Sequence, residues 1–576
     1  MDRSRPLSRC LPFPLVGLLV TLSVLAGPVW ASGDPLLNTP PPKPVRIPAE
    51  FEPMQAVVVV WDAISEWGDF YRYVADDVRL IVLCDSLGMV EQIRNELSQA
   101  GVNTDNCEFY QLSDGVIARD GLPWFLFTDG NEPAFVQNQL ETDQWFIPPY
   151  GLQQGYTVYR SGLSLDGGDF MTDGQGTAVS LEDTAIRHTA MGDEFMQRVR
   201  DYWGVHAYYF VSNKAQGLRS YPHIDCLAKF LSPDAIMVAK VPSSNDLYER
   251  SEAAAAYLGR QVSCHGTPYR VVRVEAPQDE PYVNSLILNG KVFVPILDHE
   301  ADAGALATYE AAMPGYEVIG IRNRIAGGLS WWMPFWALHC DTMGIADEQM
   351  LYIEHTPLLD RPPTSQGFPI TARIVAHSQT EFVDGTPVVP WRALADGSES
   401  TASWNVAGMT PDAETEDHQY LGYIPSQPVG TVVQYYLQAK DASGRDETHP
   451  YIGEPQAHTF TVTTVGADVS AVSAQRGGSI EIYMNGGLDN AQQRYRLAYS
   501  LSADSELTES ARTALPDTTI FDGFDGQLDD AGIGAAGMTL VGPLPSDWVG
   551  TTLCVSLELP DQQDDATNMV RIRILE

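Results

Sequence analysis

Short apolar runs separated by amphipathic stretches give the first part of the chain its pattern. Residues 56–61 and 80–84 are almost wholly apolar and rich in Val, Ile and Leu, as buried strands are. Residues 89–100 space their apolar side chains at the period of a helix, and residues 108–112 indicate another strand. This alternation predicts an α/β domain.

The alternation continues to about residue 358. It predicts strands at 235–241, 271–275, 286–295 and 317–321, and helices at 246–258 and 301–313. Within 286–295, Asn289-Gly290 predicts a tight hairpin turn.

The pattern changes at residues 360–363, after which strand alternation and turn residues replace helical periodicity. Residues 431–440 alternate and end in a turn at 441–445, which favours an immunoglobulin-like β-sandwich. A second β-rich segment with Gly-Gly turns follows. The predicted organisation is a signal peptide (1–31), a Pro-rich linker (32–46), the α/β domain (47–360), the sandwich (361–465) and a C-terminal β-rich domain (466–576).

The N-terminal residues have the pattern of a secretory signal. Arg3, Arg5 and Arg9 precede an apolar stretch at 11–26, and small residues around Ala31 suit cleavage. No later apolar run reaches the roughly 20 residues that a membrane span needs. We therefore expect a protein that is secreted or held in the periplasm or cell envelope, without a membrane span.

The net charge of −40 narrows the choice of partners. Nucleic acid is not expected, because its binders need a basic surface. A cationic substrate would be steered inward by this charge, although an acidic surface also serves solubility. The acidic residues 523–530 could hold Ca²⁺ or simply be solvated, and the β modules could contact a cell surface or glycan.

Cysteine is sparse for a secreted protein, so a disulfide scaffold is not expected. Cys10 leaves with the signal, and Cys84 ends an apolar run that predicts burial. Cys226 and Cys264 are a possible disulfide pair, whereas Cys340 must stay reduced if it is a nucleophile.

The α/β domain contains the residue types needed to hydrolyse a guanidinium group. Carboxylates bind this planar cation by paired hydrogen bonds, a thiolate attacks its carbon, and a His transfers protons. Candidates are Asp120 before a Gly-Leu-Pro turn, His223 and Asp225 on either side of Ile224, and Cys340 after an aromatic-rich stretch. Each alone has an ordinary explanation, as a turn residue, a satisfied His or a buried inert Cys.

Local geometry refines these candidates. If residues 223–225 are extended, His223 and Asp225 face the same side. His339 adjoins Cys340, but neighbours in a strand point to opposite faces, so it is the weaker partner for the thiol. Asn284 opens a predicted strand and could line a site, and Asp166 precedes a Gly-rich turn, where an acid could orient the catalytic His.

The order and spacing of six segments resemble one family. They are Pro48-Ala-Glu-Phe-Glu-Pro53, the Arg119-Asp120 turn, Gly167-Gly-x-Phe-Met-Thr-Asp-Gly174, His223-Ile-Asp225, Asn284-Ser-Leu-Ile287 and Leu338-His-Cys-x-x-Met-Gly-Ile345. Together they resemble the Porphyromonas-type peptidylarginine deiminase and agmatine deiminase family over about residues 46–358. The resemblance implies a pentein fold, an α/β propeller of five ββαβ-like units around a central funnel that holds the site.

The resemblance also implies roles. Asp120 and Asp225 would grip the guanidinium, His223 would be the acid–base group, Cys340 the nucleophile, Asn284 a wall of the site and Asp166 the residue that orients His223. The implied chemistry needs no metal and no organic cofactor.

The substrate is less strongly indicated. Ile117 stands where relatives commonly have Trp, and residues 138–146 contain Glu141 and Asp143 but no Arg that could clamp a C-terminal carboxylate. The order of modules favours a secreted enzyme that converts arginine residues of peptides or proteins to citrulline and ammonia through a covalent thiouronium. One alternative is an agmatine deiminase that forms N-carbamoylputrescine. Another is a non-enzymatic secreted binding protein with a decayed catalytic domain.

Overall fold

The structure is a computed structural model. It describes residues 36–61, 67–111, 117–137, 154–213, 219–323, 330, 332–394, 402–412, 418–464, 466–469, 473–474, 479–485, 492–502, 521–522, 525–528, 533–539, 552–558 and 569–574. The predicted signal peptide and the loop at 138–146 lie outside these residues. Among the described helices, none has the length and apolar character needed to cross a membrane.

The α/β part is built from five small sheets. Two of them have four strands, which follow one another by hydrogen bonding in the order β17 (Thr342–Ala346), β2 (Met54–Val60), β3 (Arg79–Cys84) and β4 (Cys107–Gln111), and in the order β1 (Leu36–Leu37), β7 (Thr157–Arg160), β6 (Pro133–Gln137) and β5 (Trp124–Phe127). The other three have three strands each. They are the sheet of β8 (Met171–Thr172), β9 (Thr177–Leu181) and β10 (Ala207–Val211), the sheet of β11 (Ala228–Ser232), β12 (Ala235–Lys240) and β13 (Arg270–Glu275), and the sheet of β14 (Leu286–Leu288), β15 (Lys291–Pro295) and β16 (Glu317–Ile321).

The five sheets repeat one pairing rule. An antiparallel pair (β17–β2, β5–β6, β8–β9, β11–β12 and β14–β15) is extended by a parallel strand (β3, β7, β10, β13 and β16). Parallel neighbours need a crossover connection, which is usually helical. The predicted α/β class is confirmed, while the arrangement of the five units as a propeller stays a prediction.

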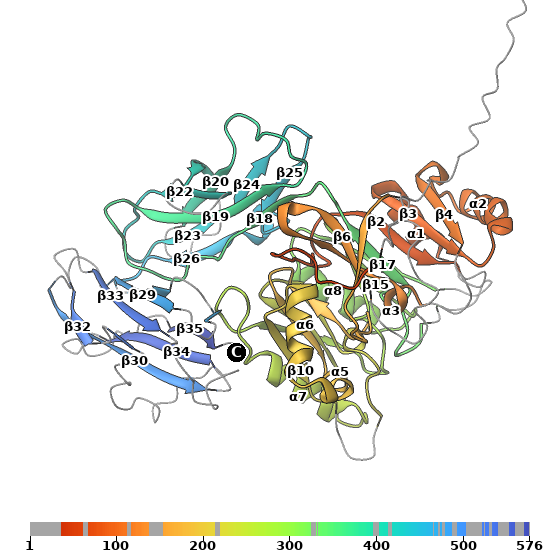
Figure 1. Cartoon of the computed structure of the whole chain (residues 1–576), viewed down its shortest axis with the longest axis horizontal. Coiled ribbons are helices and arrows are strands. Elements are labelled where there is room, and N and C mark those ends of the chain that lie inside the picture. The colour runs from red at the N-terminus through yellow and green to blue at the C-terminus, as the bar shows by residue number, and fades with distance from the viewer. Residues whose placement is uncertain are drawn as a thin grey trace, which may run out of the picture. The chain divides into compact units, whose positions relative to one another are not determined.

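Helices supply most of these crossovers. They are α1 (Gly68–Asp77), α2 (Val90–Gln99), α5 (Glu182–Arg187), α6 (Asp193–Trp203), α7 (Tyr248–Leu258) and α8 (Asp302–Ala312), and a short α3 (Ala118–Gly121) precedes β5. Helix α6 shows why they form where they do. Phe195, Val199, Tyr202 and Trp203 are buried along one face of it. In Figure 1, α5 and α7 lie against β10.

Local sequence accounts for strand β2 and for one tight turn. Val57, Val58 and Val59 are all buried. Because successive side chains of a strand point to opposite faces, both faces of β2 are covered. The hairpin predicted at Asn289-Gly290 is confirmed, since it joins β14 to β15 with φ of 45° at Asn289 and 83° at Gly290. Positive φ at both central residues is what a type I′ turn requires.

Beyond the α/β part, the described residues form strands joined by turns and loops, with one short 3₁₀ helix at Glu454–Gln456. One hydrogen-bonded sheet system contains β18 (Leu351–Glu354), β19 (Phe368–Ala376), β20 (Val388–Leu394), β21 (Asn405–Pro411), β22 (Gln419–Ile424), β23 (Val432–Tyr435), β24 (Leu437–Lys440), β25 (Asp446–His449) and β26 (His458–Thr461). The single strand expected at 431–440 is therefore two strands. The immunoglobulin-like class and the domain limits stay predictions.

The last segment forms two further sheets. One contains β27 (Gly466–Val469), β29 (Ser479–Asn485), β33 (Ile533–Thr539) and β31 (Phe521–Asp522). The other contains β28 (Ser473–Ala474), β35 (Met569–Ile574), β34 (Thr552–Glu558), β30 (Arg494–Ser502) and β32 (Asp525–Gln527). Only part of the candidate Ca²⁺ stretch at 523–530 belongs to the described residues.

Candidate active site

Each of the five α/β sheets has a predicted site residue shortly before the edge strand of its antiparallel pair. Asp120 precedes β5, Asp166 precedes β8, His223 and Asp225 precede β11, Asn284 precedes β14, and Cys340 precedes β17. A repeated fold thus presents one polar segment per unit. The structure brings the six residues together in two adjoining groups.

The first group joins two carboxylates to a histidine. His223 Nε2 lies 3.2 Å from Asp166 Oδ2, and its Nδ1 lies 3.7 Å from Asp120 Oδ1. His223 and Asp120 are 22% and 17% exposed, so the group is mostly buried but reachable. Asp166 is thus placed as the predicted orienting acid would be.

A glycine pair lets these segments approach each other. The Gly168 N–H donates to Asp120 Oδ1 and to Asp166 Oδ1, both at 3.2 Å. The Gly168 carbonyl accepts from the Asp225 N–H at 3.1 Å. A Cβ at Gly167 would lie 1.8 Å from the Arg119 carbonyl oxygen, so only glycine fits there.

Burial and charge set the ionisation of this group. Burial, reinforced by the charge of Asp166, raises the pKa of Asp120 to about 8. Burial opposes ionisation of Asp166 too, but the hydrogen bond and charge of His223 bring its pKa below the usual value. Burial disfavours the charged form of His223, yet Asp166 and Asp120 raise its pKa to about 10. The site therefore keeps His223 protonated near neutral pH, ready to act as an acid.

The second group surrounds the nucleophile candidate. Asn284 Nδ2 donates to Cys340 Sγ at 3.3 Å, and Asn284 Oδ1 accepts from the Cys340 N–H at 3.3 Å. Asp225 Oδ2 lies 3.7 Å from Cys340 Sγ. The Cys340 carbonyl accepts from the Arg119 N–H at 2.9 Å, which ties the thiol segment to the Asp120 segment. Asn284 thus fixes the loop that carries the thiol.

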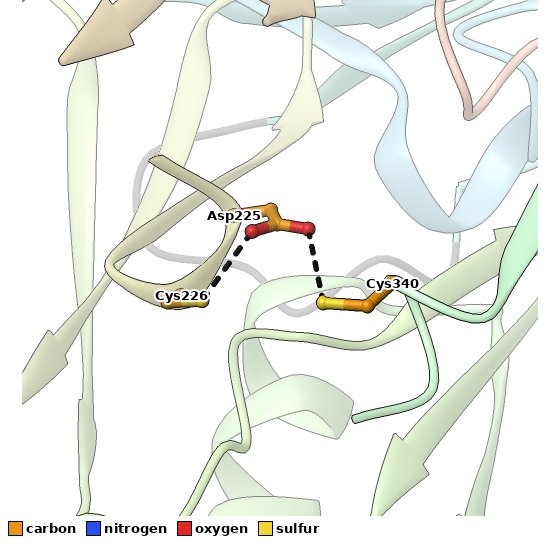
Figure 2. A group of neighbouring side chains, drawn as sticks. All are labelled: Asp225, Cys226 and Cys340. Carbon is orange, nitrogen blue, oxygen red and sulfur yellow. Dashed lines mark hydrogen bonds between the residues drawn. The ribbon is translucent and has the colours of Figure 1, made fainter. Parts of the chain in front are cut away.

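A second thiol adjoins the first. Figure 2 shows Asp225 between Cys226 and Cys340, with a contact from Cys226 Sγ to Asp225 Oδ1 at 3.4 Å. The contact with Cys340, together with burial and the charge of Asp225, raises the pKa of the Cys226 thiol well above its usual range. The suggested Cys226–Cys264 disulfide is wrong: both thiols are free, and Cys264 instead contacts the Pro233 carbonyl at 3.7 Å.

The backbone at residues 223–225 also differs from expectation. His223 is extended, but Ile224–Cys226 form one 3₁₀ turn. Buried Asp169 holds this turn, because its Oδ1 accepts from the Ile224 N–H and the Leu181 N–H, both at 3.0 Å. His223 and Asp225 therefore join different groups, the first with Asp166 and the second with Cys340.

The structure also identifies residues that sequence reasoning missed. His339, dismissed as the weaker partner, contacts Asp225 at 2.7 Å and Glu50 at 2.7 Å. Alternation does not apply to it, because β17 begins only at Thr342. The other missed residue is Glu50, which pairs with Lys229 at 2.6 Å. A signal existed in Lys229, because it lies between apolar residues of strand β11 and a buried charge requires a partner.

Two sets of side chains have the spacing of metal ligands. The candidate ligand atoms of Asp225, Cys226 and Cys340 lie within 4.8 Å of one another, as do those of Asp120, Asp166 and His223. Both sets coincide with the groups described above.

The site thus brings a thiol, three carboxyl groups and a His together in one mostly buried place. The sequence model described as Porphyromonas-type peptidyl-arginine deiminase matches residues 46–344, which are 299 of the 576 residues. The chain therefore belongs to this family, and it is a guanidine deiminase, a hydrolase of C–N bonds.

Similar proteins extend over the same part of the chain. The agmatine deiminase of Pseudomonas aeruginosa is 23% identical over 345 residues, which cover 50% of this chain and 93% of that protein. The agmatine deiminase of Pseudomonas putida is 24% identical and covers 50% of this chain and 93% of that protein. The solved structure of the Enterococcus faecalis agmatine deiminase is 18% identical, has a TM-score of 0.44, and covers 53% of this chain and 96% of its own.

Proposed function

We propose that the protein hydrolyses arginine side chains of peptides or proteins to citrulline and ammonia, with Cys340 as the nucleophile. The observation that carries the proposal is that Cys340, Asp225, His223 and Asp120, from segments that precede three different sheets, meet in one mostly buried site. Asp120 and Asp225 would bind the guanidinium and aim its carbon at the thiolate.

The first half-reaction follows from this placement. The Cys340 thiolate forms a C–S bond to the guanidinium carbon, which gives a neutral tetrahedral adduct. His223 transfers its proton to one amino group, the C–N bond breaks, and ammonia leaves. What remains is a cationic thiouronium on Cys340, beside Asp225, whose negative charge favours it.

Hydrolysis completes the cycle. Neutral His223 takes a proton from water as the oxygen bonds to the thiouronium carbon. The second adduct collapses to the ureido product: the C–S bond breaks, Cys340 departs as a thiolate, and the hydroxyl proton is released to solvent, where the ammonia takes it up. Overall, a guanidinium and water give a ureido group and an ammonium ion.

Peptidyl arginine is favoured by the match to the peptidyl-arginine deiminase family over residues 46–344 and by the β modules that follow it. Agmatine is the second candidate, because the relatives named agmatine deiminase align over almost their whole length. Glu141 and Asp143, which are outside the described residues, would suit the second cation of agmatine. We further propose that residues 1–31 direct the protein out of the cytoplasm.

The test is ureido-product formation by the full protein on a peptide with internal arginine, a peptide with C-terminal arginine, and agmatine. Turnover of either peptide supports the proposal, and turnover of agmatine alone supports the second candidate. The Cys340→Ser variant is the blank. No product from any of the three substrates contradicts both candidates.

A further inference from the structure

A second histidine lies behind the substrate-binding carboxylate. His339 Nδ1 is 2.7 Å from Asp225 Oδ2, and His339 Nε2 is 2.7 Å from Glu50 Oε2. His339 is 4% exposed and Asp225 is 2% exposed. This Glu50–His339–Asp225 row is separate from His223, which contacts Asp120 and Asp166.

Glu50 is the anchor of the row. Besides His339, it accepts from Lys229 Nζ at 2.6 Å, from an Arg119 guanidinium nitrogen at 3.2 Å, and from the Ile287 N–H at 2.8 Å. Burial opposes its ionisation, but the charges of Lys229, His339 and Arg119 bring the pKa of Glu50 well below its usual value. Glu50 is thus a fixed negative charge that orders the elements around it.

Both partners of the His339 ring are carboxyl groups. Burial opposes ionisation of Asp225, yet the hydrogen bond and charge of His339 lower the pKa of Asp225. An ionised carboxylate only accepts hydrogen bonds, so Asp225 needs a donor such as a ring N–H of His339. The ring is held from two sides, by Asp225 at Nδ1 and by Glu50 at Nε2.

Asp225 depends on this contact for its orientation. Its other side-chain contacts among the described residues are with the thiols of Cys226 at 3.4 Å and Cys340 at 3.7 Å. Thiols are weak donors and would not fix a carboxylate. The main chain of His339 is held as well, because its N–H donates to Asn284 Oδ1 at 2.9 Å and its carbonyl accepts from Arg119 Nε at 3.3 Å.

We propose that His339, held by Glu50, is a positioning residue that keeps Asp225 charged and turned toward the guanidinium of the substrate. The inference rests on the proposed function, in which Asp225 grips that cation. It also gives a role to Glu50, the first acid of the segment at 48–53. His339 does not touch the reacting carbon; it acts through Asp225.

The test compares variants of the full protein by how strongly Cys340 prefers a cationic reagent. Alkylation rates with 2-chloroacetamidine, a cation, and 2-chloroacetamide, its neutral analogue, are measured alongside kcat and KM on arginine peptide and agmatine. His339→Gln removes the donor to Asp225, and His339→Asn retains one near the Nδ1 position. Glu50→Gln removes the anchor's charge. His299→Asn is the matched control, since His299 pairs with Glu280 at 3.1 Å away from the site.

The expected result is that His339→Gln lowers the amidine-to-amide rate ratio by about tenfold or more and kcat/KM by a similar factor, as loss of a charged hydrogen bond does. The rate ratio of His339→Asn should be close to that of the unmodified protein. Glu50→Gln alone should lower the rate ratio, but the double variant with His339→Gln should have nearly the same ratio as His339→Gln alone. The control keeps the ratio of the unmodified protein.

Three outcomes overturn the inference. The ratio in His339→Gln could stay within threefold of the unmodified protein, which would show that Asp225 does not need His339. Both reagents could slow equally while the melting temperature falls, which would indicate a structural role alone. The unmodified protein could show no cation preference, which would contradict the proposed grip as well. If no substrate is turned over but Cys340 strongly prefers the cationic reagent, the proposed substrates are rejected. The role of His339 is then still tested by the amidine-to-amide rate ratio.

Discussion

Substitution by alanine should have different effects at two neighbouring glycines, lowering activity at Gly168 and stability at Gly167. A Cβ at position 168 would meet His223 Nδ1 at 2.5 Å and Asp120 Oδ1 at 2.9 Å. Both are ends of partly exposed side chains, so in Gly168→Ala they would retreat by about 0.5–1 Å to reach ordinary contact distances. A displacement of this size at reacting groups costs about 100-fold in rate.

The Gly167→Ala variant meets a different obstacle. Its Cβ would lie 1.8 Å from the Arg119 carbonyl oxygen and 2.8 Å from the carbonyl carbon. These are backbone atoms, and they cannot move without shifting the segment that carries Asp120. We expect a loss of unfolding free energy of about 1–3 kcal/mol or more, as in overpacked cores.

The assay measures kcat/KM and the denaturant midpoint for both variants. Gly304→Ala in α8 is the control, because its added Cβ meets nothing within 4 Å. Gly168→Ala should lose about 100-fold in kcat/KM and keep its midpoint, whereas Gly167→Ala should lose stability. Activity of Gly168→Ala within threefold of the unmodified protein would refute the placement of His223 and Asp120.

Three further predictions concern charge. The kcat/KM of the unmodified protein should fall below about pH 8 as Asp120 takes up a proton, and above about pH 10 as His223 loses one; a flat profile across these values would contradict the assigned groups. Asp166→Asn should lower kcat by about 100-fold or more. It should also move the fall in kcat/KM at high pH to a lower pH, because the charge that holds the proton on His223 is gone. If that fall stays at the same pH, Asp166 is not the partner of His223. Burial lowers the pKa of His355 in the folded protein to about 4. As the pH falls below 6.5, the histidine is therefore protonated in the unfolded chain but still neutral in the folded one, and this difference lowers the free energy of unfolding. The stability deficit of His355→Gln should therefore narrow by about 2 kcal/mol between pH 7 and pH 5 in denaturant titrations, and a constant deficit would contradict this reasoning.

The local sequence predicted most of the strands and helices of the α/β part. The strands expected at 80–84 and 235–241 became β3 (Arg79–Cys84) and β12 (Ala235–Lys240), because their apolar periodicity reflects burial directly. The break between β23 and β24 was not predictable. Polar–apolar alternation runs through Tyr436, but its N–H donates instead to the Pro390 carbonyl, a partner 46 positions earlier.

The site was predictable only as far as residue types and order allow. Asp120, His223, Asp225, Asn284 and Cys340 each precede a strand, so the sequence could nominate them one by one. The turn at Ile224 depends on Asp169, which contributes from 55 positions earlier. The role inferred for His339 depends on Glu50, 289 positions away. Contacts of such range leave no local pattern.

The central claim is that Cys340 forms a covalent bond to the carbon of a guanidinium group. We would test it first by acid-quenching the full protein during turnover of an arginine peptide or agmatine and measuring its mass and the modified peptide by mass spectrometry. The account predicts a thiouronium adduct on the peptide that contains Cys340, formed and lost within the turnover time and absent in Cys340→Ser. Product formation by Cys340→Ser at the rate of the unmodified protein would contradict it.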